Sequence, residues 1–445
     1  MIAIWALIAF IAAIVLWNAV LKRSIGEAMI IGFAVVGAFA GREAPRYMWN
    51  GFVDAIHAEI TFAALAFIFM SYILAKTPVL NRLIDILNSF LGRMRGGPVY
   101  TTTVAGAIFG AVAHVGASMA AVVGSVTVPW MKRSGVSGEL SATVVAGSAG
   151  MGLTFPFSAT MFILVGSSTI SGMMDADEII VPLAIAGLWC LGYRLALCFY
   201  LIRRNGLQPI APGDRIPARR SLRVGWTSML LLIPLLIPLS LTHGPVAAAL
   251  GRHTDLVMSK ALSIITWIPV LMILLVLFLG RRHLPQSGKG WWKILGESAP
   301  QFGIIGTTLV AAFSASAVLG ELQLPQQLTT LLESLTAPTW LMAILVGIIV
   351  VVIAIPLTAS ATIAAVGPVA VAALVGTGVA APVAAAAVLV FASTEGASPP
   401  SGAPIYIASG IARIDPSKIF VPLLKYYCIP ILAIGVLVTL GFLPV

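Results

Sequence analysis

The chain has 445 residues, of which 59% are hydrophobic and 9% are charged, and its mean hydropathy is +1.03. Because one soluble core cannot bury that much apolar surface, the composition excludes a soluble globular protein and predicts an all-α polytopic membrane protein. The formal net charge of +10 does not indicate a nucleic-acid partner, since the basic residues gather in short loops between apolar runs and there orient the chain in the lipid bilayer.

Apolar runs of spanning length predict about ten membrane-crossing helices. They lie at about residues 2–20, 26–40, 56–75, 140–170, 179–202, 225–243, 261–280, 300–319, 382–410 and 420–443. The first run lacks a small-residue cleavage site, so we expect a spanning helix and not a removed signal peptide. Two further apolar stretches, 98–131 and 338–376, are interrupted midway by small and polar residues, in "AVAHVGASMAA" and "IPLTASATIAA".

The basic loops indicate whether the two interrupted stretches cross the membrane or turn back. Basic residues gather in six loops, near residues 22–23, 76–95, 132–133, 203–223, 281–293 and 413–418. If each interrupted stretch is a re-entrant hairpin, all six loops fall on one face, which the positive-inside rule makes cytoplasmic. Arg219 and Lys289 are then inside, and the acidic "MMDADE" and both chain ends are outside. The loops 41–55 and 244–260 fall outside although they also carry basic residues.

An internal repeat relates the two interrupted stretches. At one ungapped offset of 243 residues, "GASMAAVVGSVTV" from residue 116 aligns with "ASATIAAVGPVAV" from 359, and "FPFSAT" from 155 aligns with "SPPSGA" from 398. The first hairpin turns at a basic loop, inside, whereas the matching turn at Gly376 to Gly378 is uncharged and falls outside. The repeats are therefore inverted in the membrane, as in secondary transporters, where the binding site lies at the repeat interface.

The repeat divides the chain into six segments. They are scaffold helices with an interfacial arm helix (1–97), a first transport repeat of re-entrant hairpin and broken helix (98–178), central scaffold helices (179–299), a scaffold helix with an outer arm (300–337), a second transport repeat of the same kind (338–419) and a C-terminal helix (420–445). Residues 77–94 have one apolar side, which predicts an arm helix lying flat at the cytoplasmic interface, and 324–335 looks like its outer counterpart.

Prolines interrupt the long helix of each repeat. Pro156 removes the N–H that would bond the carbonyl of Gly152, and Pro399 and Pro400 do the same for Glu395 and Gly396. A freed carbonyl in a bilayer needs a partner, and a desolvated sodium ion that also binds nearby hydroxyls is a suitable one. The N-termini of the half-helices that follow favour an anionic substrate. A single kink is often satisfied by neighbouring helices, but two kinks in equivalent positions favour a binding site.

The candidate site residues follow from these interruptions. The predicted sodium ligands are Gly116, Ser118, Gly152, Ser158, Thr358, Ser360, Glu395, Gly396 and Ser401. The predicted substrate-binding residues are Thr154, Ser398, Pro399 and Pro400. We expect no catalytic residue and no cofactor besides sodium as the coupling ion.

The sequence resembles a known family from about residue 60 to the end. The most specific parts are the basic turn "PWMKRSG" from residue 129 and the double-proline "PPSG" from 399, which look like the large membrane subunit of tripartite ATP-independent periplasmic (TRAP) transporters. The resemblance implies sodium-coupled import of an organic acid by an elevator motion, in which the hairpins and broken helices move together against a scaffold. It also implies two partners, a small four-helix membrane subunit and a periplasmic substrate-binding protein, and a multi-pass location in the bacterial inner membrane.

The chain departs from the family pattern at three places. The serine-rich first break of the family is Val115-Gly116-Ala117-Ser118 here, the double proline of the first broken helix is Pro156-Phe157, and the acidic residue common in the second break is Thr358. The sodium stoichiometry and the identity of the substrate therefore do not follow from the resemblance.

Other functions are compatible with parts of this pattern. An elevator-type symporter of an anion with sodium that needs no binding protein would share the hairpins and broken helices. A membrane-embedded enzyme would need a catalytic constellation, but no Ser/His/Asp, HExxH or paired-Asp pattern occurs in the spans. A channel would need a continuous polar lining, which the spans lack. We therefore expect a transporter and not an enzyme.

Overall fold

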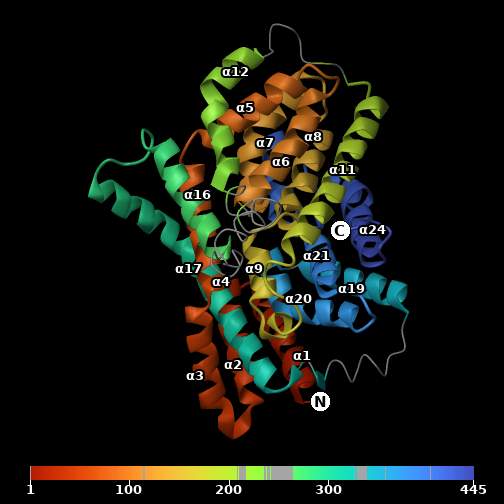
Figure 1. Ribbon diagram of the computed structural model, residues 1–445. Helices are drawn as coiled ribbons and strands as arrows, with labels where there is room; N and C mark the ends of the chain where they lie inside the picture. Colours follow the sequence, from red (N-terminus) through yellow and green to blue (C-terminus); the bar gives the residue numbers. More distant parts are fainter. Residues whose placement is uncertain are drawn as a thin grey trace.

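The computed structural model describes residues 2–445 with the exception of 114–115, 208, 210–216, 235–236, 238–240, 242–263, 325, 328–337, 356 and 401. Within these residues every regular element is a helix, and the helices form one elongated bundle (Figure 1). The all-α prediction is therefore confirmed.

Among the described residues, three helical segments are individually long and apolar enough to cross a membrane, and two bent helix pairs raise that number to five. The three are Ile180–Arg204, Phe302–Glu321 and Pro416–Thr439. The bent pairs are Gly41–His57 with Glu59–Ala75 and Gly138–Thr154 with Ala159–Val165. The total of ten spans stays a prediction, since the other apolar helices have only 10–17 residues.

The N-terminal region differs from the expectation of a loop at 41–55. It consists of α1 (Ile2–Ile14), a π segment (Val15–Val20), α2 (Ile25–Ala38), a 3₁₀ turn (Gly41–Glu43), α3 (Ala44–His57) and α4 (Glu59–Ala75). The loop prediction is wrong because Pro45 starts a helix here, and α3 then bends by 52° into α4. Arg46, Asn50 and Asp54, spaced four residues apart, form one exposed polar side of α3, and they interrupt the apolar run that marks a span.

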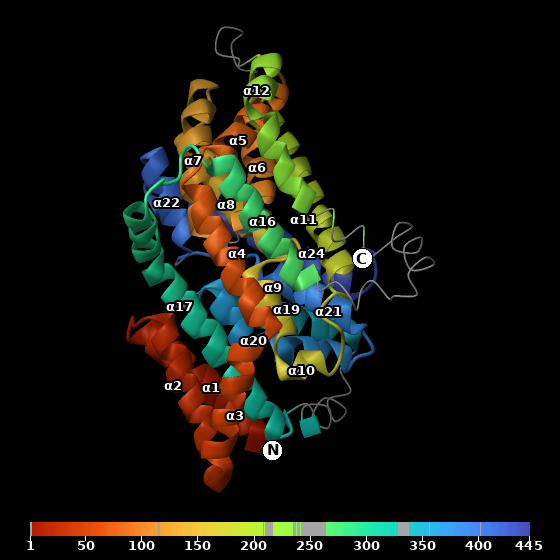
Figure 2. The ribbon, with the colours of Figure 1, turned by 60° about the vertical axis from the view of Figure 1, so that its left-hand side comes forward.

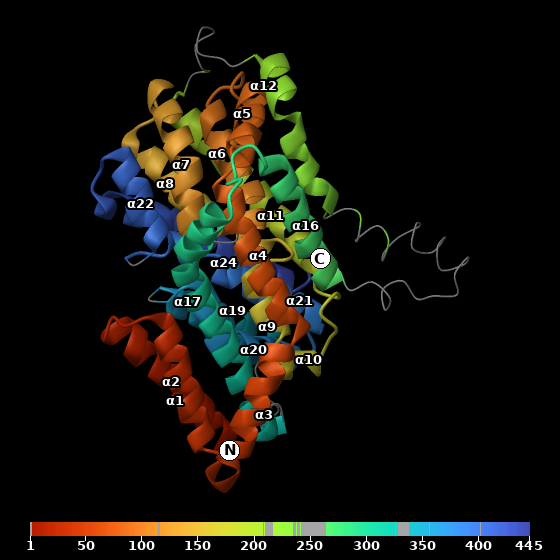
Figure 3. The ribbon, with the colours of Figure 1, turned by 90° about the vertical axis from the view of Figure 1, so that its left-hand side faces the viewer.

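Helix α17 (Gly288–Glu321) is the central scaffold element. It packs against α2, α3 and α4, while α16 (Ile264–Gly280) packs against α4. Figure 2 shows α17 running between the first three helices and the rest of the bundle, and Figure 3 shows α1 and α2 together on one side of α17. A glycine allows one of these close approaches, because a Cβ at Gly51 of α3 would lie 3.0 Å from the carbonyl oxygen of Ser314.

The predicted arm at 77–94 is helix α5 (Val79–Leu91), which buries one side against α12 (Ala218–Gly225). A 3₁₀ segment, η5 (Trp226–Leu232), follows α12. The predicted outer arm, 324–335, lies mostly outside the described residues.

Each interrupted stretch contains two helices in its described residues, and after each stretch come two further helices that a 3₁₀ segment separates. The first half contains α6 (Gly97–Ala113), α7 (Gly116–Arg133), α8 (Gly138–Ala149), the 3₁₀ segment η3 (Gly150–Thr154), α9 (Ala159–Val165), α10 (Ser168–Ser171) and α11 (Ile180–Arg204). The second half contains α19 (Thr339–Ala354), α20 (Ala359–Val375), α21 (Ala381–Ala392), η6 (Glu395–Ala397), α22 (Ala403–Ala412), η7 (Pro416–Ile419), α23 (Phe420–Leu423), η8 (Leu424–Cys428) and α24 (Ile429–Thr439).

The helix bounds of the two halves recur at the offset of 243 residues. Helices α8 and α21 coincide residue for residue at this offset, and α7 and α20 begin at equivalent residues. The turns before α8 and α21 contain Gly135 and Gly378, whose φ angles of +80° and +93° favour glycine. In Figure 1 the pair α6–α7 lies in the upper half of the molecule and the pair α19–α20 in the lower half.

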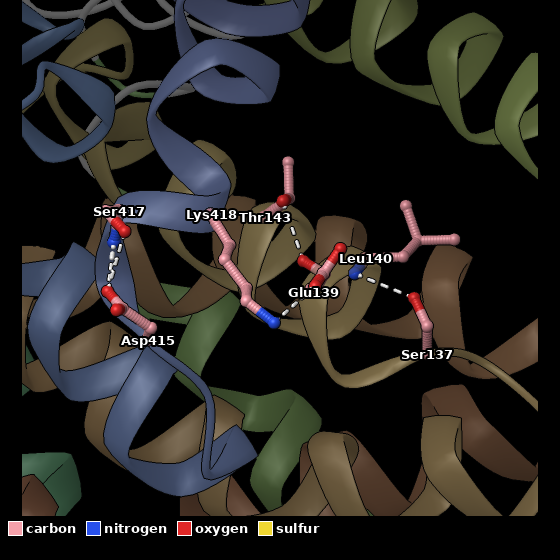
Figure 4. Close-up of polar contacts among 7 residues, drawn as sticks. All are labelled: Ser137, Glu139, Leu140, Thr143, Asp415, Ser417 and Lys418. Atoms are coloured by element: carbon pink, nitrogen blue, oxygen red, sulfur yellow. Dashed lines mark hydrogen bonds and ion pairs between the residues drawn. The ribbon is translucent and has the colours of Figure 1, made fainter.

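Each half packs its hairpin against the broken helix of the other half. Helix α7 contacts α22, and α20 contacts α9. The amino group of Lys132, in the last turn of α7, donates to the carbonyl of Ala412 at the C-terminus of α22 (2.6 Å), where the helix dipole favours a cation. Figure 4 shows a neighbouring tie, an exposed ion pair of 3.4 Å between Lys418 and Glu139, beside the capped starts of α8 and η7.

Helices α11 and α24 pack against the repeats. Helix α11 contacts α6, η3 and α21, and α24 contacts α19 and α21. Arg194 of α11 is only 2% exposed, and its Nε donates to the carbonyl of Gly147 in α8 over 3.2 Å. These contacts join α11 to the repeats, whereas our division of the chain groups residues 179–299 with the scaffold.

Candidate functional site

A cavity of about 190 Å³ lies where the two repeats meet the scaffold. The two halves contribute residues from their hairpin breaks and broken helices, and α2 and α17 close the other side. The cavity is lined by Ile25, Gly116, Ala117, Leu153, Thr160, Ile304, Thr308, Thr358, Ala359, Ser360, Glu395 and Ala403. A small solute or a partly dehydrated ion fits such a volume, and both halves would contact it.

Four of the predicted site residues share this cavity. They are Gly116 of the first hairpin, Thr358 and Ser360 of the second, and Glu395 at the second break. Glu395 is the one ionisable side chain among the described lining residues. The other lining groups are hydroxyl, aliphatic or backbone, so Glu395 alone among the described lining residues can carry a charge.

The two broken helices contact each other directly through their backbones, at the start of η3 in the first half and just before η6 in the second. A Cβ at Gly150 would lie 1.9 Å from the carbonyl oxygen of Ser393, so only glycine permits this approach. Gly150 and Ser393 are equivalent at the offset of 243 residues, so in this contact a residue of the first half meets its own counterpart in the second half. A second close approach joins η3 to helix α6 of the same half, since a Cβ at Gly152 would lie 2.2 Å from the carbonyl oxygen of Gly110.

The carbonyls that the sequence predicts to be free are partly used. The Gly152 carbonyl accepts from the N–H of Phe155 (3.4 Å), and the Glu395 carbonyl accepts from the N–H of Ser398 (3.2 Å). The expectation of wholly free carbonyls is therefore wrong, because each helix tightens into a 3₁₀ segment before its proline. Each oxygen still has a second lone pair for another partner.

The predicted hydroxyl ligands also have backbone partners. Ser158 caps α9 by accepting from the N–H of Met161 (3.0 Å), and Thr358 caps α20 by accepting from the N–H of Ala361 (3.3 Å). Serine and threonine are preferred at this position because they satisfy an otherwise unpaired helical N–H. These two caps place the N-termini of α9 and α20 beside the breaks.

Two further hydroxyls are turned toward the local backbone. The Thr154 hydroxyl donates to the carbonyl of Met151 (2.8 Å). The Ser398 hydroxyl donates to the carbonyl of Thr394 (2.8 Å) and lies 3.6 Å from the sulfur of Cys428. Neither residue lines the cavity.

The other predicted residues that the structure describes do not line the cavity. Ser118 is half-buried on α7, and Gly396 packs against the N–H of Gly150. Pro399 is buried, whereas Pro400 is exposed and its carbonyl accepts a hydrogen bond from the Tyr406 hydroxyl. Ser401 lies outside the described residues.

Several cavity residues were not predicted from the sequence. Thr160 and Ala403 line the cavity at equivalent positions of the two halves, and Thr308 of α17 lies on the scaffold side. The pairs Gly116/Ala359 and Ala117/Ser360 are also equivalent at the offset of 243 residues. The offset of 243 residues could therefore have identified the cavity residues of the repeats from their counterparts. Thr308 is a single threonine in an apolar span, and nothing in the sequence marks it as a cavity residue.

A helical membrane protein whose two halves meet at broken helices around one cavity has the architecture of a secondary transporter. Residues 4–444 match the family model described as tripartite ATP-independent periplasmic transporter, DctM component. The chain belongs to this family, and the resemblance seen in the sequence is confirmed. The family places it among the large permease subunits of multi-pass membrane transporters.

Three bacterial relatives support this assignment. The C4-dicarboxylate TRAP transporter large permease protein DctM of Pseudomonas aeruginosa is 28% identical over 34% of this chain and 35% of its own length. The ectoine TRAP transporter large permease protein TeaC of Halomonas elongata is 26% identical over 38% of this chain and 40% of its own length. Protein y4mL of Sinorhizobium fredii is 23% identical over 78% of this chain and 77% of its own length. The two relatives with a named activity are transporter subunits and not enzymes.

Solved structures share the fold at low sequence identity. The YdaH transporter of Alcanivorax borkumensis superposes with a TM-score of 0.63 at 16% identity, covering 90% of this chain and 89% of its own. MtrF of Neisseria gonorrhoeae gives a TM-score of 0.56 at 14% identity, covering 89% of this chain and 83% of its own. The helical arrangement is therefore one that transporters use.

Proposed function

We propose that this chain is the transporting subunit of a three-component importer that moves a small organic acid together with sodium. The relatives in Pseudomonas and Halomonas are named for a C4-dicarboxylate and for ectoine, both small carboxylates, which supports this substrate class. In this proposal the repeats carry the substrate by an elevator motion against the scaffold, in the bacterial inner membrane. The partners are a small four-helix membrane subunit and a periplasmic binding protein that delivers the substrate.

The cavity between the repeats and the scaffold carries this proposal. Its lining comes from both halves and from α2 and α17, so a displacement of the repeats relative to α17 would change its surroundings. The packing is also unequal between the halves. Helix α9 packs against α4, but no comparable packing joins its counterpart α22 to α17 in the described part of the chain. Inverted repeats produce such inequality when the molecule rests in one of two end states.

The chemistry of the lining supports a sodium ion beside an anion. Glu395, Thr358 and Ser360 supply oxygen atoms, which a hard cation requires, and the close backbone at Gly116 can bring carbonyls nearby. The N-terminus of α20, at Thr358, offers a partial positive charge to a carboxylate. We retain Ser118, Gly152, Ser158, Gly396 and Ser401 as further proposed sodium ligands. Thr154, Ser398, Pro399 and Pro400 remain proposed substrate neighbours.

Reconstitution in proteoliposomes tests the function. The complete set of three proteins, with a panel of carboxylates and an imposed sodium gradient, is expected to show saturable uptake that an equal proton gradient does not drive. The chain without the binding protein is expected to transport poorly. Full uptake by the isolated chain would instead favour the symporter that needs no binding protein, and uptake driven by protons alone would contradict sodium coupling.

A further inference from the structure

Three serines join the end of the first broken helix to the scaffold. The hydroxyls of Ser167 and Ser316 lie 2.9 Å apart, the N–H of Ser168 donates to the Ser316 hydroxyl over 3.1 Å, and the Ser168 hydroxyl donates to the Ser316 carbonyl over 2.7 Å. Ser167 and Ser168 form the corner between α9 and α10, and Ser316 lies on α17. We call these three residues the serine latch.

Close packing on both sides holds the corner against α17. A Cβ at Gly166 would lie 2.5 Å from the ring of Phe313, and a Cβ at Gly320 would lie 2.9 Å from the hydroxyl of Ser168. Phe313, Ser316 and Gly320 are spaced so that they share one side of α17. The corner is thus seated on a defined site of the scaffold helix.

A shift of the corner by one helical turn along α17 would break the contacts of the Ser316 hydroxyl. The side of α17 that carries Ser316 also carries Thr308 at the cavity, then Ala312 and Gly320, at intervals of four residues. A shift of the corner by one helical turn, about 5.4 Å, would place Ala312 or Gly320 where Ser316 lies now. Neither residue has a hydroxyl, so the contacts that the Ser316 hydroxyl makes with Ser167 and Ser168 would be lost, whereas a backbone carbonyl would still be present to accept from the Ser168 hydroxyl.

The second half cannot form an equivalent latch. At the offset of 243 residues, Ser316 corresponds to Ile73 of α4, while Ser167 and Ser168 correspond to Gly410 and Ile411. In an inverted-repeat transporter, the opposite end state would bring the second corner against α4. Hydrogen bonds of this kind are therefore available in one end state and absent from the other.

We propose that the serine latch stabilises the end state seen here and has to open once in every transport cycle, so that it sets the balance between the two end states. This inference rests on the proposed elevator function. Ser316 lies near the end of α17 that the loop charges place outside, so the latch closes the outer side of the cavity.

A reversible cross-link tests whether the latch opens. The hydroxyls of Ser168 and Ser316 lie 3.3 Å apart, so cysteines at these two positions are within reach of a disulfide. Oxidation of the Ser168→Cys, Ser316→Cys double variant is expected to abolish uptake by the reconstituted three-component system, and a reductant is expected to restore it. The two single variants, treated alike, are the controls. If the oxidised double variant, with its disulfide verified by mass spectrometry, takes up substrate at the wild-type rate, the latch proposal is overturned. Sodium-driven uptake by the wild-type protein in the same assay would still support the proposed function.

Cavity accessibility provides a readout that needs no uptake. A cysteine at Ala403, an exposed cavity residue, is labelled from the outer side with an impermeant maleimide. Ser316→Ala removes up to three polar contacts and is expected to raise the outer labelling rate about five- to tenfold. The control is Ser314→Ala on the same helix, whose hydroxyl donates only to Val310 of its own helix (2.7 Å). Equal labelling rates in the two variants would overturn the proposed bias.

Discussion

Glu395 is the carboxylate on the cavity wall, and its charge gives the sharpest prediction for a single residue. Glu395→Gln keeps the size of the side chain but removes the charge. We expect the sodium concentration for half-maximal uptake to rise about ten- to a hundredfold, because an interaction with a charged group contributes about 1.5–3 kcal/mol. Uptake measured against sodium concentration tests this. Glu139→Gln, in an exposed ion pair with Lys418, is the matched control, and an equal effect of the two changes would contradict the assignment.

Ser158 has a structural role that the sequence does not reveal. It is fully buried and caps α9, so Ser158→Ala should lower the free energy of unfolding by about 1 kcal/mol. As a proposed sodium ligand it should also weaken apparent sodium affinity about five- to thirtyfold. Thermal unfolding in detergent and sodium-dependent uptake measure the two effects separately. Ser401, outside the described residues, carries the same sodium prediction.

The control for Ser158 is Ser125→Ala. The Ser125 hydroxyl is exposed and donates to Val122 of its own helix, away from either break, so neither property should change. A Ser158→Ala variant with reduced stability and unchanged sodium dependence would assign this serine to capping alone.

At the scale of helices, the pair α4–α17 carries a pH-dependent contact outside the spanning segments. The amino group of Lys76 lies 2.7 Å from the carboxylate of Glu297, and the Tyr72 hydroxyl also donates to it. The hydrogen bond from Lys76, followed by that from Tyr72, lowers the pKa of Glu297, and the bond to Glu297 raises the pKa of Lys76. Because both groups are more than two-fifths exposed, solvent screens the pair and its contribution to stability is small.

The sign of each pKa shift sets the pH window of this contact. The lowered pKa of Glu297 means that its stabilisation is complete above the unfolded pKa, about 4.3, and is lost as the pH falls through the folded value. The raised pKa of Lys76 means that its stabilisation is lost only as the pH rises above about 10.4. The difference in Tm between wild type and Glu297→Gln should therefore be constant from about pH 5 to 9 and shrink below about pH 4. A difference that grows on acidification would contradict the ion pair, and Glu43→Gln, in an exposed pair with Arg46, is the control.

At the scale of the whole molecule, the inverted repeat predicts opposite sides for two turns. Arg219 and Gly376 are both exposed, and Gly376 has a right-handed φ of −59° that accepts cysteine without strain, unlike Gly378. Arg219→Cys should react with an impermeant maleimide from the cytoplasmic side and Gly376→Cys from the outer side. Lys289→Cys, in the first turn of α17, is the inside control. Labelling of Gly376→Cys from the cytoplasm would remove the inverted-repeat interpretation.

Local signals made much of this fold predictable. The helix breaks were found because Pro156 and Pro399 remove backbone donors and because small residues interrupt both hairpins. The offset of 243 residues then predicted that helices of the two halves correspond, as α8 and α21 do. The family followed from the same segments, since they contain its most specific residues.

What the sequence could not supply depends on partners distant along the chain. Helix α3 was missed because its polar side breaks the apolar run. Helix α11 is attached to the repeats by packing against α6, η3 and α21 and by the hydrogen bond from Arg194 to Gly147, none of which the sequence reveals. Ser158 and Thr358 are caps because of where their helices begin, which residue type alone does not fix. The cavity brought together Glu395 and Thr358 as anticipated, but Thr308 joined them only through the packing of α17.

The hairpin of each half packs against the broken helix of the other half, and this packing also determines how the chain can fold in the membrane during synthesis. Helix α9 ends at Val165, but α20, which packs against it, begins only at Ala359. At roughly 5–20 residues per second, the ribosome leaves that face of α9 uncovered for roughly 10–40 s. During this time lipid or an insertion factor has to shield surfaces that are buried in the finished protein. The first half therefore reaches its final packing only after the second half has been synthesised.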